Sequence, residues 1–142
     1  MTLDEMLGLP GAPLSVAATL TGADTASRAT GFAYQGMTGL DAIDTPGGGC
    51  LYLRGEELVL IYLGDAALPT GLDDESLRTA LGTAGDELPS REGKTASLHV
   101  VADQGVAWSE DNGAIGFVEL FPPTTGRDYR RRIYRKPPKF VR

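Results

Sequence analysis

The chain has 142 residues, of which 42% are hydrophobic and 23% are charged, and these proportions exclude a disordered or fibrous protein. This length is sufficient for one hydrophobic core, and no apolar run reaches the ~18 residues that a membrane-spanning helix needs. The formal net charge is −6, and the single cysteine, Cys50, excludes an intramolecular disulfide and is typical of a reducing compartment. Because the acidic amino terminus also differs from a secretory signal, we expect a cytoplasmic location.

The amino-terminal third of the chain predicts little regular structure. Thr2 and Glu5 have the spacing of a capping box, which favours a short helix after Thr2. Residues 11–21 are mildly apolar, and their pattern fits a short helix as well as a strand. Glycines interrupt residues 22–49, so we expect a mobile loop region there, except for a strand around Phe32.

The central part of the chain predicts a hairpin, a helix and a second group of strands. Two apolar runs, 50–54 and 58–63, flank a glycine-containing turn, which is typical of a hairpin. Asp73 favours the start of a helix that ends before Gly82. The other predicted strands are 96–102, 105–109 and 114–121, with a type I′ turn at Asn112-Gly113 between the last two.

The predicted fold class is α+β, with an antiparallel meandering sheet and two to four short helices packed on one face. Charge defines the predicted domain organisation. Residues 1–124 are expected to form a single acidic domain with a formal charge of −13, because they hold five basic and 18 acidic residues. Residues 125–142 are expected to form a basic C-terminal helix or tail with a charge of +7, from eight basic residues and one acid.

The basic tail is the clearest candidate for an interaction surface. Its candidate binding residues are Arg127, Tyr129, Arg130, Arg131, Arg132, Tyr134, Arg135 and Lys136. Arginine and tyrosine are common among the residues that dominate protein interfaces, which favours another protein as the partner. Basic and aromatic residues also suit nucleic acid, although the acidic body would repel a phosphate backbone. In a third, structural interpretation, the arginines are solvated or pair with nearby carboxylates, while Tyr129 and Ile133 anchor the helix.

The sequence presents no catalytic or metal-binding signature. His99 is the only histidine, and strand alternation places it opposite Leu98, without a second histidine or a cysteine nearby in sequence. Cys50 begins an apolar strand and is interpreted as a small core residue. The carboxylate clusters 73–75 and 110–112 are interpreted as helix capping and turn chemistry. We therefore expect no metal and no cofactor, and the alternative is a small enzyme or ligand-binding domain with a pocket near Cys50 and His99.

Residues 72–121 also contain an ordered series of features. A short helix closes in Ala80-Leu81-Gly82, a polar link follows, a strand is entered through Gly93-Lys94, and Gly105-Val106-Ala107-Trp108 leads to a hairpin into 115–121. In this order, the segment resembles the helix-plus-antiparallel-sheet module of beta-lactamase inhibitor protein and of the SmpA/OmlA proteins. The resemblance implies a non-enzymatic scaffold whose sheet face binds another protein. The chain differs from that group because we expect no export signal, no lipid-attachment cysteine at its start and no disulfide pair.

These observations favour a non-enzymatic protein that binds another macromolecule. We expect the partner to be a protein, and the role to be that of an inhibitor, an immunity-type protein, an adaptor or an accessory subunit. The strongly acidic body would attract a basic partner over long range and accelerate their encounter. The oligomeric state is left open by the sequence.

Overall fold

The computed structural model describes residues 1–139 and contains one eight-stranded antiparallel sheet and four α-helices. The strands are β1 (Ala29–Tyr34), β2 (Met37–Thr45), β3 (Gly49–Arg54), β4 (Glu57–Gly64), β5 (Asp86–Pro89), β6 (Ser97–Val101), β7 (Val106–Asp111) and β8 (Ala114–Leu120). The helices are α1 (Leu3–Leu7), α2 (Leu14–Thr21), α3 (Asp74–Leu81) and α4 (Gly126–Arg132). The predicted α+β class with an antiparallel sheet is therefore confirmed. Within the described residues, no helix has the length and apolar character needed to cross a membrane.

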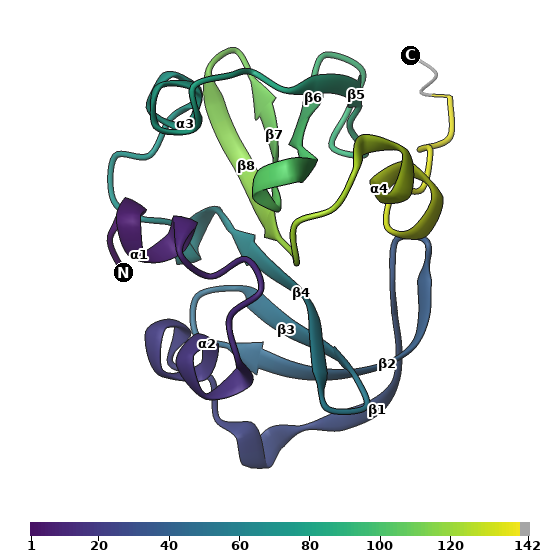
Figure 1. Cartoon of the computed structure of the whole chain (residues 1–142). Helices are drawn as coiled ribbons and strands as arrows, with labels where there is room; N and C mark the ends of the chain where they lie inside the picture. The colour runs from purple at the N-terminus through teal and green to yellow at the C-terminus, as the bar shows by residue number, and fades with distance from the viewer. Residues whose placement is uncertain (140–142) are drawn as a thin grey trace.

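Two four-stranded meanders form the sheet. The strand order is β1-β2-β3-β4-β8-β7-β6-β5, so the first meander joins the second where β4 pairs with β8. Strands β1 and β5 are consequently the two edges of the sheet. Figure 1 shows α1, α2 and α3 on one side of the sheet, whereas α4 lies beside the end of the β1–β2 hairpin and near β5.

Side-chain alternation along the strands divides the core into two clusters. Ile61 and Trp108 belong to the cluster that packs with α1, α2 and α3. Leu60, one position before Ile61, belongs to the second cluster, to which Tyr129 and Ile133 contribute from α4 and its end. The sequence predicted two to four helices on one face. Three lie there, and α4 packs on the other face.

Residues 22–49 are not the loop region that the sequence predicted. The strand expected around Phe32 is confirmed as β1, but it continues into a second strand, β2, that pairs with β3 from Asp41 to Thr45. Of the glycines in this segment, Gly31, Gly39 and Gly49 lie in strands. At Gly49, a Cβ atom would lie 2.8 Å from the backbone oxygen of Tyr62, so the close approach of β3 and β4 requires glycine.

The central elements agree with the sequence, except at the sheet edge. The predicted hairpin is β3–β4, and α3 begins after Asp73, whose carboxylate accepts the backbone N–H of Ser76, and ends at Gly82. Strands β6, β7 and β8 match the three later predictions. Strand β5 was not predicted, because two of its four residues are acidic and the last is Pro89. Proline is tolerated there because β5 is an edge strand.

Candidate functional site

Helix α4 carries most of the predicted binding residues, and local chemistry fixes its start. The hydroxyl of Thr125 accepts the backbone N–H of Asp128 and thereby caps the helix. The helix ends at Arg132. Tyr129 is 1% exposed and Ile133 is 7% exposed, so these two side chains anchor the segment to the sheet.

The segment around α4 is bonded to both edges of the sheet. The backbone N–H of Gly36, in the β1–β2 turn, donates to the carbonyl of Ile133 at 2.8 Å. The hydroxyl of Tyr134 donates to the carbonyl of Pro89 in β5 at 2.7 Å. Residues 125–134 therefore hold a fixed position between the two sheet edges instead of projecting from the domain.

A buried polar network between α4 and the sheet anchors the helix. Tyr129 donates its hydroxyl to Oε1 of Glu119 at 2.5 Å, and Tyr34 donates its hydroxyl to Oε2 of the same carboxylate. Glu119 has no exposed surface, and this burial raises the pKa of its carboxyl group, although the two hydroxyls oppose the shift. Arg91 places Nη1 3.8 Å from Oε2 of Glu119, and its guanidinium lies 4.1 Å from the centre of the Phe117 ring.

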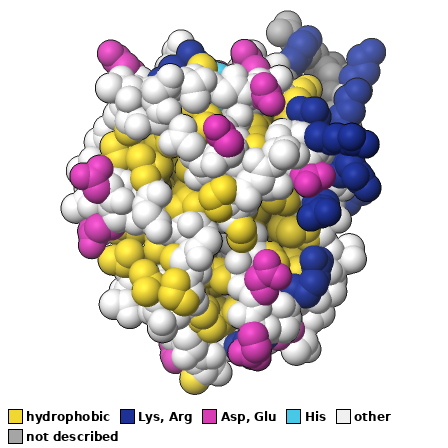
Figure 2. Space-filling model, in the orientation of Figure 1, with side chains coloured by type: hydrophobic (Ala, Val, Ile, Leu, Met, Phe, Trp, Pro, Cys, Tyr) yellow, Lys and Arg dark blue, Asp and Glu magenta, His cyan; other side chains and the backbone are white. Residues whose placement is uncertain are grey.

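Above this anchor, basic side chains form what we call the cationic face. Figure 2 shows Lys and Arg side chains gathered on the side of the molecule where α4 and the following segment lie, whereas Asp and Glu are scattered. The cationic face consists of Arg127, Arg130, Arg131, Arg132, Arg135 and Lys136, all exposed. Among residues 1–139, only Arg130 of this set has an ion pair, at 3.7 Å from Asp86, and both partners are well exposed.

Two hollows border the cationic face. The β1–β2 turn lies between them, with Gly36 lining the first hollow and Gln35 lining the second. The first hollow has a volume of about 480 Å³, and its lining includes Met37, Val59, Ile133, Arg54, Arg131 and Arg132 together with Glu57 and Asp128. The second has a volume of about 710 Å³ and is lined by Ala33, Tyr34, Gln35, Arg91, Arg135, Lys136, Pro137 and Pro138. The described residues that line the second hollow thus include three cations and no carboxylate.

The structure brings together most, but not all, of the predicted binding residues. The six basic ones lie on one face. Tyr129 is buried and Tyr134 is half-buried with its hydroxyl bound to Pro89, so neither tyrosine is a free surface anchor. Arg54 and Arg91 were not predicted; β3 carries Arg54 to the first hollow, and the β5–β6 connection carries Arg91 to the second. Neither arginine has a local sequence pattern that indicates this position.

Cys50 and His99 do not share a pocket. Cys50 lies in β3 and is 8% exposed, and His99 lies in β6 and is 2% exposed. Four strand intervals separate β3 from β6, which corresponds to about 19 Å at the usual strand spacing. Burial raises the pKa of the Cys50 thiol, which is opposite to what a nucleophilic cysteine needs. The alternative of a pocket near Cys50 and His99 therefore lacks its geometric basis.

No family model, curated protein or solved structure matches the chain. The fold and the cationic face define an α+β protein with a two-sided antiparallel sheet and a fixed basic surface. Residues 72–121, whose order of features resembles beta-lactamase inhibitor protein, form α3 and β5 to β8. No comparison tests that resemblance, and it stays a prediction.

Proposed function

We propose that this protein binds an acidic segment of another protein on its cationic face, without catalysing a reaction. The observation that supports this most directly is the concentration of exposed, unneutralised charge. Arg127, Arg131, Arg132, Arg135 and Lys136 share one face and form no ion pair within residues 1–139. A role as an inhibitor, an immunity-type protein, an adaptor or an accessory subunit fits such a surface.

The anchored backbone of α4 favours binding. Because Tyr129 and Ile133 are already buried in the free protein, a partner does not have to order this segment when it docks. The first hollow adds apolar surface from Met37 and Val59 beside the guanidinium groups of Arg131 and Arg132. Arginine next to partly buried apolar surface is the combination that dominates many protein interfaces.

The charges around the cationic face favour a short acidic segment over nucleic acid. Glu57 and Asp128 line the first hollow, and Asp86 lies at the edge of the face. A long phosphate backbone would meet these acids and the strongly acidic body, which weakens the electrostatic attraction that nucleic-acid binding depends on. A short acidic peptide, in contrast, can place its carboxylates next to the arginines without contacting these acidic side chains. A cytoplasmic location is part of this proposal, because the one cysteine is free.

The proposal can be tested with a fluorescein-labelled 20-residue peptide rich in Glu and Tyr and with a labelled 20-base-pair DNA duplex. Fluorescence anisotropy of each probe is measured during titration with the tag-free full chain at low salt. We expect saturable peptide binding that weakens as salt is added, because exposed charges are screened. Reversing Arg131, Arg132 and Arg135 together to glutamate should weaken peptide binding at least ~100-fold. Each lost ion pair with a peptide carboxylate costs about 1–2 kcal/mol of binding free energy at a partly desolvated interface.

A single reversal, Arg131→Glu, is compared with the double variant Ser15→Glu/Thr79→Glu, which makes the same change in net charge at exposed positions of α2 and α3, on the opposite face of the sheet. The two variants have the same net charge, so the overall field of the protein changes equally. Weaker peptide binding in Arg131→Glu alone supports the cationic face. Equal affinities in the two variants would contradict it, and tighter binding of the duplex than of the peptide would replace a protein partner with nucleic acid.

A further inference from the structure

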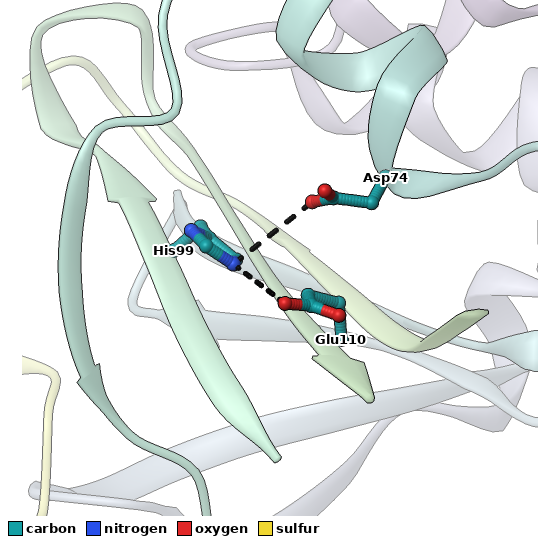
Figure 3. A group of neighbouring side chains, drawn as sticks. All are labelled: Asp74, His99 and Glu110. Carbon is teal, nitrogen blue, oxygen red and sulfur yellow. Dashed lines mark hydrogen bonds and ion pairs between the residues drawn. The ribbon is translucent and has the colours of Figure 1, made fainter. Parts of the chain in front are cut away.

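Three ionisable side chains from three different elements meet on the sheet face that packs against α3. Asp74 lies in the first turn of α3, His99 in the middle of β6 and Glu110 in β7. Figure 3 shows both carboxylates directed at one edge of the imidazole ring. Nε2 of His99 is 3.2 Å from Oε1 of Glu110 and 3.9 Å from Oδ1 of Asp74, and the three ligand atoms all lie within 4.8 Å of one another.

The hydrogen bonds of His99 leave one nitrogen facing oxygen alone. Nδ1 lies 3.2 Å from the carbonyl oxygen of Ala84, which can only accept, so Nδ1 carries the proton. A neutral ring then turns the Nε2 lone pair towards two carboxylates, while the side chain is only 2% exposed. A buried lone pair that faces two anionic groups requires a cation between them, either a proton or a metal ion.

Each of the three side chains is oriented by a further hydrogen bond. The indole N–H of Trp108 donates to Oδ1 of Asp74 at 2.8 Å, and Arg78 donates to Oδ2 at 2.7 Å. The backbone N–H of Gly113 donates to Oε2 of Glu110 at 3.0 Å. Together with the bond from His99 to Ala84, these contacts provide the outer support that metal-binding histidines and carboxylates have in proteins.

We propose that Asp74, His99 and Glu110 bind one divalent transition-metal ion of the Zn²⁺ type. Bonds of about 2.1 Å in tetrahedral geometry place ligand atoms about 3.4 Å apart, close to the 3.2 and 3.9 Å that Nε2 makes with the two oxygens. The imidazole nitrogen selects a transition metal over Mg²⁺ or Ca²⁺, which prefer oxygen alone. The side chains of Asp74 and Glu110 are 15% and 18% exposed, respectively, so water can enter and complete the coordination.

This site is independent of the cationic face, because it lies against α3 and the cationic face lies around α4. A bound ion would cross-link α3 to β6 and β7. The three ligands are far apart in sequence, and neither residues 73–75, residues 110–112 nor His99 has the spacing of a metal site on its own. The pairing of β6 with β7 places His99 opposite Trp108, so that Glu110, two residues further along β7, shares the face of both.

The experiment uses the tag-free full chain, freed of metal by a chelator, and titrates it with Zn²⁺ by isothermal calorimetry. The pH is about 7.5, because histidine and carboxylate ligands bind a metal ion in their deprotonated forms. Trp108 is the only tryptophan, and it contacts Asp74, so Co²⁺ should quench its fluorescence at the same stoichiometry. We expect one ion per chain. Glu110→Gln and Asp74→Asn should each weaken Zn²⁺ binding at least ~10-fold, because each removes a charged ligand but keeps its shape.

Two control variants locate the binding. Glu75→Gln removes a neighbouring carboxylate of α3 that is outside the cluster, and Cys50→Ser removes the one thiol; both should bind Zn²⁺ like the original chain. Circular dichroism checks that each variant is folded, and Glu110→Gln decides the question if Asp74→Asn unfolds. Absence of saturable Zn²⁺ binding, or equal affinity in Glu110→Gln and Glu75→Gln, would overturn the proposal and leave a protonated His99 between the carboxylates.

Discussion

The bond between Tyr129 and Glu119 should make a measurable contribution to stability, because it is the buried contact that holds α4. Tyr129→Phe removes the hydroxyl that donates to Oε1 of Glu119, but it keeps the ring, which packs 5.1 Å from the ring of Phe121. Glu119 retains its bond from Tyr34, so the carboxylate is not left wholly without a donor. We expect the free energy of unfolding to fall by about 1–3 kcal/mol. The lower value applies if Glu119 is protonated, and the higher value applies if it is ionised.

Urea unfolding, followed by circular dichroism and by the fluorescence of Trp108, measures this loss. For a chain of this length, the melting temperature should fall by about 2–12 °C. Tyr62→Phe is the matched control, because the Tyr62 hydroxyl has no hydrogen bond within residues 1–139 while its ring packs 5.5 Å from Phe117. If Tyr129→Phe and Tyr62→Phe differ by less than ~0.5 kcal/mol, the buried bond does not hold α4 as described.

Two further stability measurements test the protonation of Glu119 and the close backbone approach at Gly105. Burial raises the pKa of Glu119 above its unfolded value of about 4.3, so its contribution to stability is full below that pH and is lost as pH rises through the folded pKa. Glu119→Gln should therefore gain stability relative to the original chain as urea unfolding is repeated from about pH 4 to pH 8, whereas a pH-independent difference would contradict the raised pKa. Gly105→Ala should lower the free energy of unfolding by at least about 2 kcal/mol, because φ is +70° and a Cβ would collide with the carbonyl of Phe121. Gly113→Ala, at φ +86° in open space, should lose less, and equal losses would argue against the collision.

The sequence determined the elements whose signals are local. Asp73 and Gly82 bound α3 through hydrogen bonds to residues three or four positions away, and Asn112-Gly113 sets a turn through its own backbone angles. The hairpin β3–β4 and the α4 cap at Thr125 are of the same kind. Such features need no information from distant parts of the chain, because the bonding partners are neighbours in sequence.

Only the tertiary structure decided how distant segments meet. The strand β2 contains Gly39, Asp41 and Asp44, which are residue types that disfavour strands, yet it is stable because it pairs with β3 along its second half. The two hollows combine Arg54 and Arg91 with α4, and the metal candidate combines α3 with β6 and β7. These groupings depend on strand order and register, which no single segment encodes. Composition and charge therefore indicated a basic terminal surface, whereas its fixed position and the Asp74–His99–Glu110 cluster arise from long-range pairing of the sheet.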